Sequence, residues 1–194
     1  ASLMGYMYMR YHISFLTNII RIFKKSNPKL NFNSNFSEEI KELLKKDENK
    51  EIEFKSTLRT NLHTMQVDKE IEKTALKTIA AFLNSEGGTL LIGISDNKEI
   101  IGIEKDNFRN QDKFNLHLMN LIKERIGKKH LPLIDVQIGK IDKKQIARID
   151  CNPSPKPIFL KEGKEEHFYI RAGPSTTELK ASTLLGYIEK RFKK

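Results

Sequence analysis

Cysteine is nearly absent from this chain, which has one thiol, Cys151, among its 194 residues. A single thiol excludes an intramolecular disulfide framework and any zinc site built from several cysteines. Cys151 follows the strand-like run 145–150 without a histidine at a recognisable spacing, so we expect a small buried residue and not a nucleophile. This composition favours a reducing, cytoplasmic compartment.

A long uncharged run is also missing. Residues 6–23 are apolar, but Arg10, His12 and Arg21 interrupt them, whereas a spanning helix needs about 20 predominantly apolar residues. We therefore expect no membrane span, and no cleavage pattern of a signal peptide follows. An N-terminal amphipathic helix is nevertheless predicted, because four apolar residues share one helical face: Ile13, Leu16, Ile20 and Phe23. Such a helix could contact a membrane surface or another protein.

A phosphate-binding loop of the nucleotide-hydrolase type is absent too. The glycine-rich segment 84–88 (NSEGG) ends a predicted helix and enters a predicted strand. A phosphate loop has the opposite order, strand, loop and helix, with a following Lys-Ser or Lys-Thr pair. We therefore expect no ATP hydrolysis, and interpret Gly87 and Gly88 as a helix stop and a tight turn.

Positive charge is abundant. Thirty-five Lys and Arg against 25 Asp and Glu give a formal net charge of +10, which favours a polyanionic partner, either nucleic acid or an acidic membrane surface. A general lysine-rich bias is the alternative explanation. Phosphate contacts are expected at a basic cluster, which comprises Lys123, Arg125, Lys128 and Lys129 with the adjacent His130. The alternative is that these cations stabilise a helix C-terminus by interacting with the helix dipole.

Hydrophobic periodicity predicts an α+β fold, with a single mixed, mainly antiparallel sheet packed against helices. The Asn- and Ser-rich stretch 26–36 predicts a linker, so residues 1–36 form an N-terminal helix and linker and residues 37–194 form one domain. A capping signature at Ser37 opens a helix to about Lys46. Further helices are expected near 68–86, 111–126 and 179–192, and strands near 52–55, 89–94, 99–103, 133–138, 145–150, 158–160 and 167–171.

Three carboxylates have the spacing of a candidate metal site. Glu48 and Glu53 lie five apart, and Asp96 follows an apolar strand-like run; such oxygen ligands suit Mg²⁺ or Mn²⁺. Alternation along a strand puts Lys55 on the face of Glu53, where its ammonium can neutralise a phosphate. The alternative is a set of solvated charges at a strand edge, since Glu51 shares that face.

Four motifs occur in order and together resemble the Schlafen-type Alba-like (AlbA_2) domain family. They are ENKEIEFK (48–55), IAAFLNSEGGTLLIGISD (79–96), IIGI (100–103) and FYIRAGPST (168–176). The resemblance covers about residues 48–192 and implies a compact domain of helices and strands associated with nucleic-acid binding.

In family members that cleave RNA, the resemblance implies a metal-dependent endoribonuclease acting on structured, tRNA-like RNA. Carried over by motif, its catalytic and metal-binding acids are Glu48, Glu53 and Asp96, with Lys55 beside them. Cleaving animal members pair two lobes in one chain, with a supporting zinc site, whereas this chain has one lobe and a single cysteine. We therefore expect a homodimer, RNA in preference to DNA, and no zinc.

The segment 171–176 after the last predicted hairpin supplies further candidate contacts. Arg171, Ser175 and Thr176 can face a nucleic-acid backbone, although a plain turn into the closing helix explains them equally well. Two other functions stay open for the whole chain. One is a non-catalytic DNA-binding or regulatory module, and the other is a protein-interaction or membrane-tethered domain that uses the N-terminal helix.

Overall fold

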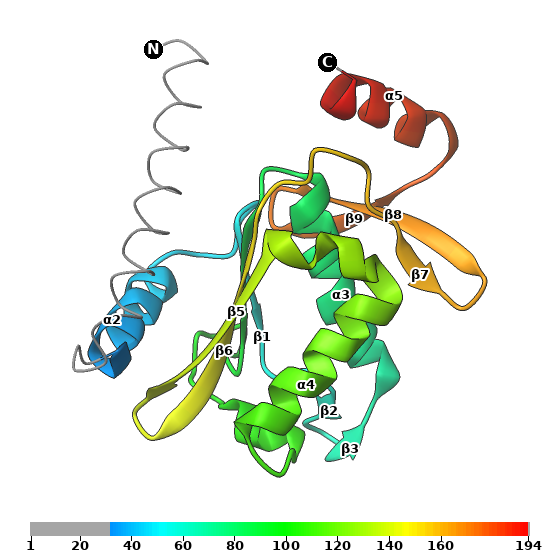
Figure 1. Ribbon diagram of the computed structural model, residues 1–194. Helices are drawn as coiled ribbons and strands as arrows, with labels where there is room; N and C mark the ends of the chain where they lie inside the picture. Colours follow the sequence, from blue (N-terminus) through cyan, green and yellow to red (C-terminus); the bar gives the residue numbers. More distant parts are fainter. Residues whose placement is uncertain (1–31, 194) are drawn as a thin grey trace, which may run out of the picture.

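The protein has an α+β fold, as the periodicity predicts (Figure 1). A computed structural model describes residues 32–193, with side chains from residue 36 onward; the amphipathic helix expected near residues 13–23 lies outside them. The described part contains a four-stranded mixed sheet and two smaller sheets of two and three strands, rather than the single sheet expected. Within it, no helix is long and apolar enough to cross a membrane.

The four-stranded sheet has the strand order β1-β4-β6-β5. β1 runs parallel to β4, and the other two pairs are antiparallel. Leu90, Leu91 and Ile92 of β4 are fully buried, which confirms the central strand that this apolar run predicts. The strands are β1 (Ile52–Lys55), β4 (Gly88–Ile92), β5 (Ile134–Ile141) and β6 (Lys144–Cys151).

One face of this sheet packs against helix α2 (Phe32–Leu44). The helix begins at Phe32 and not at Ser37, so the end of the predicted linker is helical. Phe36 explains the difference, because its ring is buried in the core between α2 and the sheet and apolar burial outweighs the local capping signal at Ser37. Gly139 of β5 makes room for it, since a Cβ there would lie 2.3 Å from a ring carbon of Phe36.

The other face packs against α3 (Lys69–Asn84) and α4 (Gln111–Ile122) and encloses the larger core (Figure 1). The side chain of Asp68 caps α3 by accepting a hydrogen bond from the Glu70 backbone amide. α4 continues into a π-helical turn (Lys123–Gly127) and then a 3₁₀ turn (Lys128–Leu133). These turns carry the basic cluster.

A three-stranded sheet packs on α3 beside the central sheet. It comprises β7 (Leu160–Glu162), β8 (Glu165–Ala172) and β9 (Ser175–Leu179), and helix α5 (Ala181–Phe192) follows. β9 occupies residues expected to form a turn. Asn84, fully buried at the end of α3, holds the layers together: its amide group donates to the carbonyls of Ile158 and Tyr169, and its oxygen accepts from the Ile158 amide.

Two local predictions differ from the structure. The expected strand 99–103 makes only an isolated bridge between Ile94 and Ile100 and leads into a 3₁₀ turn, Ile103–Asp106. The buried Asp106 carboxylate accepts backbone hydrogen bonds from residues 58–60, while its burial raises its pKa. Residues 59–67, where no strand is expected, contain a short hairpin of β2 (Thr60–Asn61) and β3 (Gln66–Val67).

Candidate functional site

A cavity of about 540 Å³ lies where β1, α3, β8 and β9 meet. It brings together three predicted site residues, Glu53 and the adjacent pair Ser175 and Thr176, which lie more than a hundred positions from Glu53 in sequence. We call it the Glu53 cavity, and its lining residues are Glu53, Thr74, Lys77, Thr78, Tyr169, Pro174, Ser175, Thr176 and Glu178.

Glu53 reaches the cavity because the side chains of β1 alternate between its two faces. Ile52 and Phe54 belong to the core beneath α2, so Glu53 faces the opposite side, where it is 8% exposed. Its Oε1 lies 2.5 Å from Nζ of Lys55, and its Oε2 lies 2.8 Å from Nη1 of Arg171. Glu53 and Lys55 therefore share a face as predicted, and two cations offset the buried carboxylate.

The side chain of Arg171 is fully buried and contacts three residues of the cavity lining, Glu53, Pro174 and Thr176. Its guanidinium donates to the carbonyls of Asn49 and Pro174, at 2.8 and 2.9 Å, and to the hydroxyl of Thr176 at 3.0 Å. Arg171 thus joins the segment before β1 to the turn between β8 and β9. Of the three predicted contacts in this segment, Ser175 is the exposed one.

Glu48 lies along the free edge of β1 and does not line the Glu53 cavity. Its Oε1 accepts a hydrogen bond of 2.7 Å from the Phe54 amide, and the Asn49 amide donates to the Ile52 carbonyl. Because β1 is at one end of the strand order, segment 47–49 covers its free edge and satisfies backbone groups that would otherwise be unpaired there.

Asp96 lies exposed in the turn that follows β4. That turn is held toward segment 47–49 by an ion pair of 2.6 Å between Lys98 and Asp47. The structure thus places Asp96 on a surface turn, Glu48 at a strand edge and Glu53 inside a cavity.

This arrangement does not form a metal centre. In the described part of the chain, no group of three or more His, Cys, Asp or Glu side chains is placed to hold a metal ion. The oxygens of Glu53 are paired with two cations, and one oxygen of Glu48 accepts a backbone hydrogen bond. As arranged, these carboxylates do not fit a shared divalent ion, and Mg²⁺ or Mn²⁺ stays a prediction.

Helix α3 supplies cavity residues that the sequence motifs missed. Thr74 and Thr78 lie four apart with Lys77 between them, so they share one side of the helix. The Lys77 ammonium lies 5.3 Å from the ring centre of Tyr169, and burial of Tyr169 raises its pKa. The polar face of an amphipathic helix was the available sequence signal.

The basic cluster adjoins the elements that form the cavity. Arg125 donates from its Nε to the carbonyl of Lys161 on β7, and Lys73 of α3 forms an ion pair of 2.5 Å with Glu162 on the same strand. Lys128 and Lys129 are exposed on the 3₁₀ turn. β7 therefore connects the basic cluster to the helix that lines the cavity.

Glu178 of β9 is paired with His167 of β8 in the three-stranded sheet. Nδ1 of His167 lies 2.7 Å from its Oε1, and this hydrogen bond lowers the pKa of Glu178 below its ordinary value of 4.5. A carboxyl group with a lowered pKa stabilises the fold above its unfolded-state pKa, and this contribution disappears as the pH falls through the folded-state value.

We therefore expect the thermal midpoint of the wild type to fall more steeply than that of Glu178→Gln between about pH 5 and 3. Circular dichroism melts across this range measure the difference. Glu166→Gln, at an exposed position of β8, is the matched control and should keep the wild-type slope. Equal slopes for Glu178→Gln and the wild type would contradict this role of the pair.

Comparison with known proteins identifies the family. The model of the family "Schlafen, AlbA_2" matches residues 48–180, whereas no curated protein matches the chain significantly. The crystal structure of the DIP2311 protein from Corynebacterium diphtheriae is similar in fold, with a TM-score of 0.54 and 20% identity. The match covers 78% of this chain and 28% of that one, so this chain corresponds to a minor part of its length.

A solution structure is also similar, that of the N-terminal domain of a putative ATP-dependent DNA helicase RecG-related protein from Nitrosomonas europaea. It has a TM-score of 0.44 and 21% identity, and the match covers 70% of this chain and 86% of that one. The family match includes β1, α3, β4 and the whole of the β7–β9 sheet, and hence every element that lines the Glu53 cavity. The chain belongs to the Schlafen AlbA_2 family.

Proposed function

We propose that this domain binds nucleic acid through the Glu53 cavity and the adjoining basic cluster, with structured RNA as its preferred ligand. Family membership indicates a nucleic-acid partner. The observation that carries the proposal is the cavity itself, which gathers three predicted site residues from both ends of the family match and lies beside the basic cluster.

The charges at this surface suit a phosphodiester backbone. Lys55 and Arg171 offset the carboxylate of Glu53, so a phosphate approaching the cavity meets little net repulsion from it. Lys77 at the lining and the exposed Lys128 and Lys129 provide cations for phosphate contacts. Such contacts position a backbone without reading its sequence.

The preference for RNA rests on the polar groups of the lining. Thr74, Ser175 and Thr176 provide hydroxyl groups, and Glu178 provides a carboxylate acceptor. The ribose 2′-hydroxyl is both a donor and an acceptor, and it is the group by which a protein distinguishes RNA from DNA.

Metal-dependent endoribonuclease activity is the more specific proposal. The ordered motif that contains Glu48, Glu53 and Asp96 supports it. Among the described residues these carboxylates form no metal-holding group, so the motifs alone support their part in cleavage. A homodimer completes this proposal, since two copies of a one-lobe domain would provide two cavities for a folded RNA.

A binding and cleavage assay tests these proposals. A fluorescein-labelled tRNA and a DNA hairpin of the same sequence are titrated with the protein at about 50 and 200 mM salt, and anisotropy is measured in EDTA, Mg²⁺ or Mn²⁺. We expect tighter binding to RNA and affinity that falls steeply with salt. Gels of the same samples should show cleavage only with a metal ion, and light scattering should give two protein chains per RNA.

Asp96→Asn is the informative variant for cleavage, because Asp96 is exposed and its replacement should not disturb the fold. It should abolish cleavage and leave RNA affinity within about twofold, whereas Asp112→Asn, at another exposed acid, should change neither cleavage nor affinity. Salt-sensitive binding without cleavage would reject the nuclease proposal, and equal or tighter binding of DNA would favour a DNA-binding module. Absence of binding to either ligand would reject the proposed function in favour of a protein-interaction domain.

A further inference from the structure

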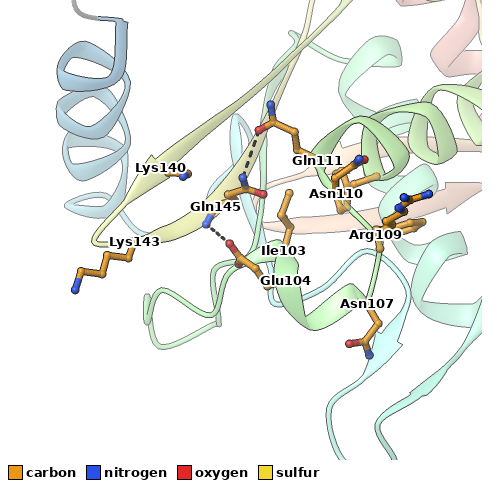
Figure 2. Close-up of a pocket in the computed structure, with 11 residues that line it drawn as sticks. Ile103, Glu104, Asn107, Arg109, Asn110, Gln111, Lys140, Lys143 and Gln145 are labelled. Atoms are coloured by element: carbon orange, nitrogen blue, oxygen red, sulfur yellow. Dashed lines mark hydrogen bonds between the residues drawn. The ribbon is translucent and has the colours of Figure 1, made fainter.

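A second cavity, of about 560 Å³, lies at the opposite end of α4 from the basic cluster. It is bounded by the tip of the β5–β6 hairpin and by the loop that leads from Asp106 into α4 (Figure 2). Its volume is within the range of about 300–1,000 Å³ that is common for ligand sites. We call it the hairpin cavity.

Among the residues that the structure describes, no ion pair offsets the positive charge in the hairpin cavity. Within residues 36–193, Arg109, Lys140 and Lys143 line the cavity and none of them forms a salt bridge. The one carboxylate among the lining residues is Glu104, and its Oε1 accepts a hydrogen bond of 2.8 Å from the backbone amide of Gln145. Asp112 and Asp142 are close in sequence to lining residues but do not line the cavity.

Amide side chains lie between these cations. Figure 2 shows Gln111 and Gln145 between the hairpin and the loop, with a weak contact of 3.4 Å from Gln145 Nε2 to Gln111 Oε1. Asn107 is exposed on the loop side. Each amide group has two donors and an acceptor, which is the pattern that matches the hydrogen-bonding edge of a base.

The loop side of the cavity is held in place by Phe108. The guanidinium of Arg59 lies 3.6 Å from the ring centre of Phe108, and its Nε donates to the Asp106 carbonyl at 3.0 Å. The ring meets Phe114 edge-on, with ring centres 5.5 Å apart. These contacts fix the loop side of the lining without using Arg109, Lys140 or Lys143, so the contacts within the described part of the chain leave the three cations available to a ligand.

We infer that the hairpin cavity binds an unpaired stretch of the RNA, with its phosphates on the three cations and a base edge on the amides. This inference rests on the proposed function and extends it to a second contact region. Gln111 and Arg125 lie at opposite ends of α4 and its π-helical turn, roughly 20 Å apart at 1.5 Å per residue. One folded RNA can therefore contact the basic cluster with a paired region and the hairpin cavity with a loop. Unpaired bases offer the free edges that such a site requires.

The test compares a labelled RNA hairpin that has an open loop with a fully paired RNA duplex, in EDTA and at about 100 mM salt. Arg109→Gln, Lys140→Gln and Lys143→Gln are combined in one variant. We expect it to bind the hairpin about tenfold more weakly than the wild type does, and the duplex within about threefold. For single strands each phosphate contact contributes about 0.7 to the salt slope, so three lost contacts lower the slope by about 2.

A variant with the same change in net charge is the control. Lys41, Lys46 and Lys156 are exposed and line neither cavity, so their combined replacement by glutamine should keep the hairpin affinity within about threefold of wild type. The inference would be wrong if the cavity variant bound the RNA hairpin as tightly as the wild type does. It would also be wrong if the control variant lost as much hairpin affinity as the cavity variant, or if the cavity variant lost as much affinity for the duplex as for the hairpin. None of these results would affect the proposed function. Absence of RNA binding by the wild type would overturn the proposed function and the inference with it.

Discussion

Replacing Arg171 with methionine is expected to lower the free energy of unfolding by about 4 kcal/mol, because removing one partner of a buried ion pair leaves the other charge uncompensated. The Glu53 carboxylate would keep only Lys55 as a partner. The carbonyls of Asn49 and Pro174 would also lose their donor, and unsatisfied buried acceptors add to the loss. Urea unfolding followed by circular dichroism measures it.

Arg191→Met is the matched control for this prediction. Arg191 also donates to a backbone carbonyl at the end of α3, that of Ser85, but its side chain is 26% exposed. We expect a loss of about 1 kcal/mol there. A comparably small loss for Arg171→Met, together with a large loss of RNA affinity, would mean that Arg171 contacts the ligand directly and does not hold the cavity wall.

Reversing three charges of the basic cluster should have the largest effect on RNA affinity. Lys123, Lys128 and Lys129 become glutamate in this variant, so contacts that attract phosphate become repulsive. We expect binding to structured RNA to weaken by about a hundredfold or more at about 100 mM salt, with a smaller salt slope. Anisotropy titrations at several salt concentrations measure both quantities.

The same reversal at Lys41, Lys46 and Lys156 controls for net charge, because these exposed residues belong to neither cavity. That control should lose much less affinity than the cluster variant. If both variants lose the same affinity, the protein attracts RNA through its overall charge of +10, and the basic cluster is not a specific contact region.

The sequence predicted those parts of the fold that depend on local signals. Asp68 caps α3 through its side chain, and Gly87, with φ at +84°, ends the helix in a conformation that suits glycine. The apolar run 89–94 predicted a strand buried on both sides, and residues 90–92 of it are fully buried. The start of α2 was wrong because the burial of Phe36 depends on β5, about a hundred residues away, and no local pattern contains that contact.

The candidate site was predictable to a similar extent. Alternation along β1 placed Glu53 and Lys55 on one face, and the structure confirms it. The partnership of Glu53 with Arg171 was not predictable, because it joins β1 to a second sheet whose position depends on buried contacts such as those of Asn84. Glu48 and Glu53 are near in sequence, yet the segment before β1 folds back along the strand, so Glu48 accepts a hydrogen bond from the Phe54 backbone amide while Glu53 lines the cavity.

That folded-back segment also restricts how two copies of the domain can join. With segment 47–49 hydrogen-bonded along β1, a strand from another molecule can pair with β1 only after displacing Glu48. The opposite end of the central sheet, β5, has no such covering strand in the described part of the chain. If the central sheets of two copies join into one continuous sheet, they must therefore meet at β5. Such a dimer would place the β5–β6 hairpins of the two molecules close to the junction and leave the two β1 strands at its far ends.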